Sequence, residues 1–123
     1  MAAGLVLDTV LPMAGGLIAG AAIGLERELR GHPAGLRTHT LVCLASTVLM
    51  LAAARQGEWA LGLIPSERIV TDPTRMAHGV LTGIGFLCAG VIVRDGFSIQ
   101  GLTTAASLWM TSALGLLLSL IHI

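Results

Sequence analysis

The chain of 123 residues has room for one domain, and its composition indicates the solvent that surrounds this domain. Hydrophobic residues make up 54%, and the 16 glycines raise the apolar share to about 67%, against roughly 45–50% in soluble domains. Charged residues make up only 11%, and seven arginines balance seven acidic residues. These values exclude a disordered or collagen-like chain, argue against a water-soluble globule and give no electrostatic case for binding nucleic acid. We therefore expect a membrane protein.

The charged residues are clustered, and four long uncharged stretches lie between the clusters, the first interrupted only by Asp8. Each stretch holds about 17–21 residues, a helical length of about 26–32 Å that matches the roughly 30 Å hydrocarbon core of a bilayer. None shows the alternation of a barrel strand. The sequence thus predicts an all-α, polytopic transmembrane helix bundle, one domain over residues 1–123. The four expected spans are residues 5–25, 38–54, 76–93 and 102–121.

The connections between these stretches predict a compact bundle. The segment Arg94–Ser98 is a tight link in which Gly96 is free to adopt a positive φ angle and Ser98 is placed to cap the next helix. The third and fourth helices should therefore be antiparallel neighbours. Asp72, followed by a proline, predicts the start of the third helix. Trp59, in the longest loop, suits an anchor at the membrane interface.

The distribution of arginines predicts the orientation in the membrane. Four spans would place residues 26–37 and 94–101 on one side, and residues 55–75 with both termini on the other. The first side carries four arginines and the second carries three, so the positive-inside rule places the first side in the cytoplasm.

Small residues recur at every fourth position along three of the expected helices, a spacing typical of close helix packing in lipid. The first helix carries a doubled GxxxG pattern, the third a single one, and the fourth a row of small and hydroxyl residues. The hydroxyl row has two interpretations: a polar path or oligomer contact, or ordinary packing in which each hydroxyl donates to the carbonyl four residues back, which we favour. The expected packing residues are Gly16, Gly20, Gly24, Gly79, Gly83, Ser107, Thr111 and Gly115.

Polar residues gather at the helix ends on the predicted cytoplasmic side. Glu26 and Arg37 lie nearest to the apolar stretches, where mixed charge indicates an ion-binding vestibule, a docking surface for another protein, or interfacial side chains with weak surface ion pairs. Magnesium binds one or two carboxylates and keeps several waters, so Glu26 and Asp95 are the candidate metal ligands. No nucleophile–base set, phosphate loop or metal-ligand spacing is present, so we expect no enzyme, no catalytic residues and no bound cofactor, with Mg²⁺ the one ligand or transported ion considered.

The opposite side presents a charge that needs an explanation. Arg75 lies in the first turn of the third helix, where the helix dipole disfavours a cation, so it should have an acidic partner. The candidate partners are Asp8, Glu67 and Asp72. His78, about one turn deeper, is either a titratable group or hydrogen-bond partner across helices, or a packing residue. Cys43 and Cys88 are expected to be small buried hydrophobic residues.

Four motifs occur in order along the chain: Ile23-Gly24-Leu25-Glu26-Arg27-Glu28, Ala34-Gly35-Leu36-Arg37-Thr38, Gly83-Ile84-Gly85-Phe86-Leu87 with Ala89-Gly90-Val91-Ile92, and Gly101-Leu102-Thr103-Thr104-Ala105-Ala106 with Trp109. Together they resemble the MgtC/SapB family of bacterial inner-membrane proteins. The resemblance covers roughly residues 12–118 and is specific because the four motifs keep their order and spacing.

The resemblance implies a multi-pass protein of the bacterial inner (plasma) membrane that is linked to magnesium homeostasis. Many members continue into a fifth span and a soluble C-terminal domain, which we do not expect within residues 1–123. The characteristic polar residues of the family fall, by position, near the ends of the expected helices, on both sides of the membrane. We add two further polar residues to them, His78 and Arg94. The expected polar functional cluster is then Glu26, Arg27, Arg37, Thr38, Arg75, His78, Arg94, Thr103 and Thr104.

Two functions remain open at this stage. The first is a regulator of magnesium homeostasis that acts on other membrane proteins, in contact with the lipid bilayer and as a homo-oligomer, with a dimer favoured. The second is an oligomeric transporter or channel subunit for Mg²⁺ or another cation, in which Glu26, His78 and the Thr103–Ser119 stripe mark the path. Four spans are few to enclose a pore, so the second function requires an oligomer.

Overall fold

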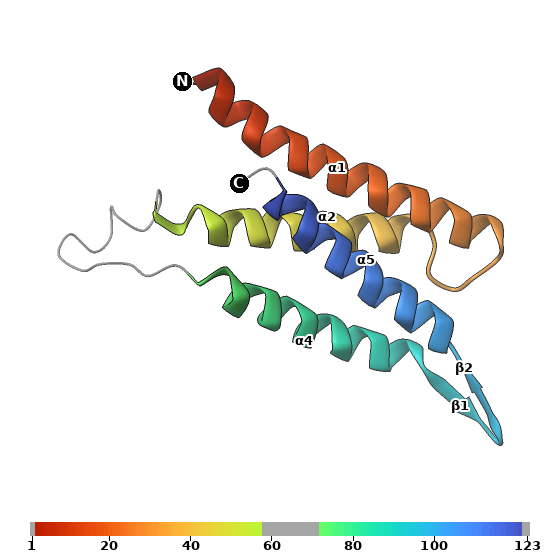
Figure 1. Ribbon diagram of the computed structural model, residues 1–123. Helices are drawn as coiled ribbons and strands as arrows, with labels where there is room; N and C mark the ends of the chain where they lie inside the picture. Colours follow the sequence, from red (N-terminus) through yellow and green to blue (C-terminus); the bar gives the residue numbers. More distant parts are fainter. Residues whose placement is uncertain (1, 58–71, 122–123) are drawn as a thin grey trace.

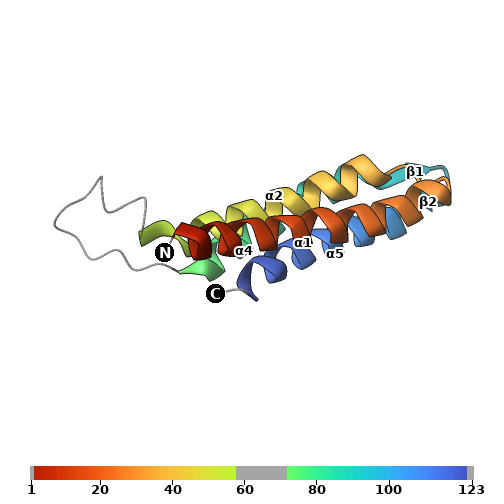
Figure 2. The ribbon, with the colours of Figure 1, turned by 90° about the horizontal axis from the view of Figure 1, so that it is seen from above.

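The structure, a computed structural model, describes residues 2–57 and 72–121 and is a bundle of helices with one short β-hairpin (Figure 1). The helices lie alongside one another in both views (Figures 1 and 2). The loop between the first two helices lies at the same end of the bundle as the hairpin (Figure 1). The elements are α1 (Ala2–Leu29), α2 (Leu36–Ala54), α4 (Pro73–Val91), β1 (Val93–Asp95), β2 (Ser98–Gln100) and α5 (Leu102–Leu120).

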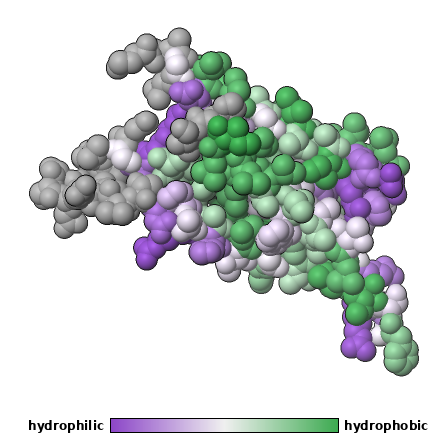
Figure 3. Space-filling view, in the orientation of Figure 1, coloured by the Kyte–Doolittle hydropathy of each residue, from purple (hydrophilic) through white to green (hydrophobic). Residues whose placement is uncertain are grey.

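Three of the described helices are long and apolar enough to cross a membrane: Val6–Leu29 within α1, Leu36–Ala54 and Leu102–Leu120. Hydrophobic residues cover the middle of the face shown in Figure 3, and hydrophilic residues gather toward its two ends. The fourth expected span, α4, does not join them, because Arg75, His78 and several glycines lower its apolar content. Membrane crossing by α1, α2 and α5 is thus supported, and crossing by α4 stays a prediction.

Helix α1 extends past its apolar stretch, through Glu26 and Arg27, to Leu29. It ends in a glycine motif, in which Gly31 has a φ angle of 72°. The Gly31 amide donates to the Glu28 carbonyl at 3.0 Å and the His32 amide donates to the Arg27 carbonyl at 3.0 Å. These two bonds satisfy carbonyls that a helix end leaves without partners. The charged residues therefore lie on the last helical turns and not in a loop.

Helix α2 lies directly against the glycine row of α1. A Cβ atom built on Gly20 would lie 2.8 Å from the Cβ of Cys43 and 2.8 Å from the His39 carbonyl oxygen. One built on Gly24 would lie 2.7 Å from the Cα of Leu36, and one on Gly16 would lie 2.5 Å from Thr47 Oγ1. Any larger side chain at these glycines would push the two backbones apart.

Helix α5 approaches α2 from another side, again through a glycine. A Cβ on Gly115 would collide with the Cys43 carbonyl oxygen and would lie 2.9 Å from the Cβ of Ser46. Helix α2 is therefore held between α1 and α5, with backbone close to backbone on both sides. Dispersion and interhelical hydrogen bonds act best at such short separations in lipid.

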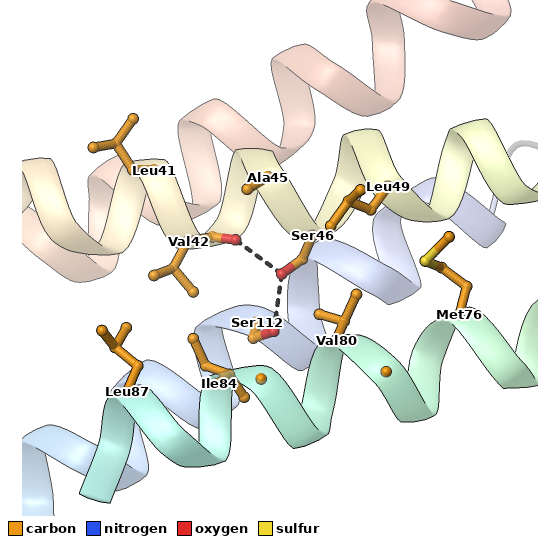
Figure 4. A pocket seen from close by; sticks show the side chains of 12 residues that line it. Leu41, Val42, Ala45, Ser46, Leu49, Met76, Val80, Ile84, Leu87 and Ser112 are labelled. Carbon is orange, nitrogen blue, oxygen red and sulfur yellow. Dashed lines mark hydrogen bonds between the residues drawn. The ribbon is translucent and has the colours of Figure 1, made fainter. Parts of the chain in front are cut away.

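Helix α4 packs mainly against α5 and makes fewer contacts with α2. Buried Cys88 meets Ala105 and Leu108 of α5, while Cβ atoms built on Gly79 and Gly83 would meet nothing within 4 Å. Both glycines were expected to be packing residues, and neither has a neighbour that requires a glycine. They line a groove of about 500 Å³ between α2 and α4, in which the side chains are apolar except for Ser46 and Ser112 (Figure 4).

The link between α4 and α5 is an antiparallel hairpin, in which Val93 pairs with Gln100 and Asp95 with Ser98. The positive φ expected at Gly96 is confirmed, at 59°. The cap expected at Ser98 is wrong, because Ser98 begins β2 and Gly101 is the N-cap of α5, with a φ angle of 88°. A Cβ at Gly101 would also collide with the Val91 carbonyl, so a residue other than glycine is strained there.

The glycine contacts predict a difference between two otherwise matched substitutions. Gly20→Ala should lower the free energy of unfolding by about 1–3 kcal/mol, because its methyl group overlaps α2. Gly83→Ala adds the same group where nothing lies within 4 Å, and alanine favours helix, so it should not destabilise the protein. Reversible unfolding in detergent mixed with dodecyl sulfate, followed by circular dichroism, measures both. Equal losses in the two variants would contradict the packing.

Candidate functional site

The structure divides the expected polar cluster between the two ends of the bundle (Figure 1). Arg75 and His78 lie in the first turns of α4, at the end opposite the hairpin. The other members lie at the hairpin end, on the last turns of α1, the first turns of α2 and α5, and in the hairpin. These members are Glu26, Arg27, Arg37, Thr38, Arg94, Thr103 and Thr104.

Arg27 and Thr104 form the buried part of this end. Arg27 is only 7% exposed, and its Nη2 atom donates a hydrogen bond to Thr104 Oγ1 at 2.9 Å. Thr104 is 3% exposed, so the bond joins α1 to α5 away from water. The Nε atom of Arg27 is buried without a hydrogen-bond partner among the described residues. A guanidinium has five donors, and this one therefore has unused hydrogen-bonding capacity.

The acidic residues nearby are already engaged and lie toward water. Glu26 pairs at 2.6 Å with Arg30, four residues further along the chain and just past the end of α1, with both side chains largely exposed. Such surface pairs contribute about 0.3–0.5 kcal/mol. Glu28 accepts a hydrogen bond from the Leu36 amide at 2.8 Å, which satisfies a free donor at the start of α2. Within residues 2–57 and 72–121, no carboxylate forms an ion pair with Arg27.

The candidate magnesium ligands do not form a defined metal site. Asp95 is exposed in β1, and Glu26 is engaged with Arg30. Neighbouring Arg94 donates from Nε to the Gly96 carbonyl at 3.0 Å within the hairpin turn. In the described part of the chain, no group of three or more His, Cys, Asp or Glu side chains comes together. A magnesium site at Glu26 and Asp95 stays a hypothesis.

The polar contact between α2 and α5 contains a residue that sequence reasoning did not select, His39. It is fully buried, and its Nδ1 donates to the Gly35 carbonyl at 3.0 Å, because a carbonyl only accepts. Its Nε2 bonds to Ser107 Oγ at 3.0 Å, and Ser107 is also within 2.9 Å of the Thr104 carbonyl. The sequence feature that could have identified His39 is its four-residue spacing from Cys43 and Thr47, which places all three residues against the glycine row of α1.

Part of the hydroxyl row of α5, Ser107 and Gly115, lies on this contact, and so does Ser112, which is not in the row. Ser112 hydrogen-bonds to Ser46 at 2.8 Å, and Thr47 donates to the Gly115 carbonyl at 3.0 Å (Figure 4 shows the first of these). Thr111 donates to the Ser107 carbonyl at 2.7 Å, one helical turn back. Thr103 is exposed at the start of the helix. Ser119, near its end, is buried with no partner among the described residues.

The two cysteines are free and buried, in separate contacts. Cys43 lies between Gly20 and Gly115. Cys88 donates from Sγ to the Ala105 carbonyl at 3.1 Å, which helps to attach α4 to α5. Both positions agree with the interpretation of these residues as small buried side chains.

At the opposite end, Asp72 is the N-cap of α4, as predicted. Its carboxylate accepts from the Thr74 amide at 3.0 Å and from Thr74 Oγ1 at 2.6 Å, and these bonds lower the pKa of Asp72 from its ordinary value. Arg75 is exposed and forms no ion pair with Asp8 or Asp72. The third candidate partner, Glu67, lies outside the described residues, as does Trp59.

His78 is exposed on α4, and so it lies on no buried interhelical contact. A contact that the sequence did not predict lies at the same end, where Arg55 donates from Nη1 to Thr9 Oγ1. This bond joins the end of α2 to the early part of α1. Among the described residues, buried hydrogen bonds join α2 to α5 and α1 to α5, and the Cys88 bond joins α4 to α5.

The chain is similar to known proteins over most of its length. The profile of the MgtC family matches residues 13–123. Relatives include "Protein MgtC" of Brucella abortus, 40% identical over 110 residues, and "Putative magnesium transporter YhiD" of Escherichia coli K12, 43% identical over 101 residues. "Protein MgtC" of Salmonella typhimurium is 36% identical over 116 residues. No solved structure matches the chain.

These alignments cover 89%, 82% and 94% of this chain, in the same order, but only 41%, 46% and 45% of the relatives. The chain therefore spans less than half the length of the curated relatives that it matches. What is similar is one part of each relative.

The Arg27–Thr104 bond predicts a measurable coupling between α1 and α5. Thr104→Val keeps the shape of the side chain but removes the acceptor, so it should cost about 1–3 kcal/mol of unfolding free energy by leaving the buried guanidinium without its bond. Thr104→Ser keeps the hydroxyl and serves as the control. In an Arg27→Met background, Thr104→Val should cost much less, because no charge is then left unsatisfied. An equal cost of Thr104→Val in both backgrounds would show that the bond does not stabilise the fold.

Proposed function

The chain belongs to the MgtC family, and we propose that it forms the membrane part of a bacterial plasma-membrane protein of magnesium homeostasis that acts by binding other membrane proteins. One observation carries the choice of binding over conduction. In the middle of the Thr103–Ser119 stripe, Ser107 and the Gly115 carbonyl hydrogen-bond to α2, and Thr111 bonds within α5, so these groups do not face an open path. We propose no catalytic activity for the chain.

A cation path needs oxygen ligands that face an aqueous space. Ser112, Thr111 and the Gly115 carbonyl instead face packed helices, and each takes part in a hydrogen bond. Ser112 and Thr111 are fully buried. The acidic side chain that would mark the entrance, Glu26, is exposed and paired with Arg30. These contacts favour a structural role for the hydroxyl row.

The hairpin end of the bundle has the properties of a contact surface. Arg37 and Arg94 are exposed there beside the exposed Glu26 and Asp95, so both signs of charge are present. Mixed surface charge gives specificity to an encounter between proteins more than it gives affinity. We propose that this end, on the cytoplasmic side, contacts the partner proteins. The glycine face of α4 and the groove beside it leave room for further copies of the chain within the bilayer, as a homo-oligomer.

The second candidate is an oligomeric transporter of Mg²⁺, and one relative carries the name of a magnesium transporter. In this case the path would lie between copies of the chain, because the middle of the hydroxyl row of α5 is buried between helices within one copy. Exposed Thr103 and Glu26 would then face each other across the interface. The two candidates differ in whether the protein alone moves the ion.

The two candidates predict opposite results in reconstituted liposomes. We expect the purified protein to give no Mg²⁺ flux above that of protein-free liposomes loaded with a magnesium-sensitive dye, and Glu26→Gln to behave in the same way. Flux in the wild type that Glu26→Gln abolishes would establish the transporter and refute the binding function. Circular dichroism of the same samples shows whether the protein is folded when no flux is seen.

A further inference from the structure

The β-hairpin carries apolar side chains that the rest of the described chain leaves largely exposed. It projects from the end of the bundle (Figures 1 and 3). All residues of its two strands are exposed, and Phe97, in the turn between them, is fully exposed. The turn requires Gly96, with its positive φ angle, but it sets no such requirement for a phenylalanine. The fold of the hairpin therefore does not explain Phe97.

The pairing of the two strands divides their side chains between two faces. Side chains alternate along a strand, and residues that pair directly share a face. Arg94 pairs with Ile99, so one face carries a cation and an aliphatic side chain. The opposite face carries the other two pairs, which are polar or acidic apart from one valine: Asp95 with Ser98, and Gln100 with Val93. The hairpin is therefore amphipathic, and its cation and its acid lie on opposite faces.

The hairpin is joined directly to a helix that is suited to cross a bilayer. Helix α5 begins at Leu102, two residues after the end of β2. Leu102 is exposed, and so is Ile92 at the end of α4, so the apolar surface continues to the base of the hairpin. Each strand has three residues and is thus about 10 Å long, close to the thickness of about 5–8 Å of one headgroup layer. The hairpin therefore starts where the headgroups of the bilayer start.

We propose that the hairpin binds the surface of the lipid bilayer, with Phe97 and Ile99 inserted among the lipids and Arg94 bound to an anionic headgroup. Apolar side chains at the membrane–water boundary bury their area in lipid, and basic side chains beside them are attracted to negatively charged lipids. Asp95 points to the other side of the hairpin, away from these lipids, as charge repulsion requires. The distribution of charge over the two faces thus matches an anionic membrane surface.

A protein partner is the alternative occupant of this face. Stable protein interfaces bury about 1,200–2,000 Å², far more than one short hairpin with two exposed large apolar side chains offers. Insertion into lipid only adds to the anchoring that α5 already provides. The inference rests on the membrane placement of α5 and not on the choice between binding and conduction, and it leaves Glu26, Arg37 and Asp95 to contact partner proteins. Its failure is therefore seen separately from any result on Mg²⁺ flux.

The test uses tryptophan fluorescence of the whole chain in liposomes. The native tryptophans are replaced by Trp59→Phe and Trp109→Phe. A single reporter is then introduced by Phe97→Trp or, as a matched control on the polar face of the hairpin, by Ser98→Trp. The two quenchers are phosphatidylcholine brominated near the top of its acyl chains, and iodide present on both sides of the membrane. Circular dichroism checks that each variant is folded.

We expect brominated lipid to quench the Phe97→Trp reporter several-fold more than the Ser98→Trp reporter, and iodide to quench it several-fold less. The proposal is overturned if iodide quenches both reporters equally, because the turn is then in water. Equal quenching of both by brominated lipid also overturns it, since the two faces then do not differ. A Phe97→Trp reporter that neither quencher reaches would be covered by protein, and this result favours the alternative occupant.

Two matched charge variants, each made with the Phe97→Trp reporter, test the anionic headgroup. Arg94→Gln removes the cation from the lipid-binding face, whereas Asp95→Asn removes the acid from the other face. Adding phosphatidylglycerol to the liposomes should increase quenching by brominated lipid in the parent and in Asp95→Asn, and should have little effect in Arg94→Gln. An equal increase in all three would overturn the role of Arg94.

Discussion

The close approach of α2 to α1 and α5 is the constraint on which the rest of the structure depends. Gly20 of α1 lies against the Cβ of Cys43 and Gly115 of α5 lies against the Cys43 carbonyl, and each brings a neighbouring backbone against that of α2. In lipid the hydrophobic effect does not drive helices together, so short separations and interhelical hydrogen bonds must do so. Both are available here only because no side chains stand at these glycines.

The hydrogen bonds between α2 and α5 follow from this approach. Once the backbones are close, His39 reaches Ser107, Ser46 reaches Ser112, and Thr47 reaches a carbonyl of α5. A buried polar group without a partner is costly in a bilayer, so these side chains bind each other and no water path between them is needed. Arg27 differs, because its charge is buried with a single neutral partner.

Much of the architecture could be predicted from the sequence because it follows from local rules. Uncharged length predicts the apolar helices, Asp72 before a proline predicts the start of α4, and Gly96 predicts the turn. The spacing of small residues along a helix, however, does not predict which other helix packs against them. The glycines spaced in this way in α1 pack against α2. In α4, Cβ atoms built on Gly79 and Gly83 would have no neighbour within 4 Å.

The candidate site was less predictable for a related reason. Charge clusters drew attention to the helix ends, whereas His39 and Ser112 act inside the bundle, where only the packing of three helices brings them to their partners. The cap of α5 was misplaced at Ser98 because a glycine N-cap with a positive φ angle has no side-chain signal. The division of the polar cluster between two ends was predicted, because alternating spans place the start of α4 opposite residues 26–37 and 94–101.

The central claim is that the polar residues between α2 and α5 hold the helices together and leave no aqueous path. Cys43 tests it most directly, since it is fully buried between Gly20 and Gly115, beside the hydroxyl row. In a Cys88→Ser background, which keeps a donor for the Ala105 carbonyl, Cys43 in liposomes would be treated with a membrane-impermeant maleimide from each side. The account predicts no labelling until dodecyl sulfate unfolds the protein. Labelling of the folded protein from either side would place water at the centre of the bundle and contradict it.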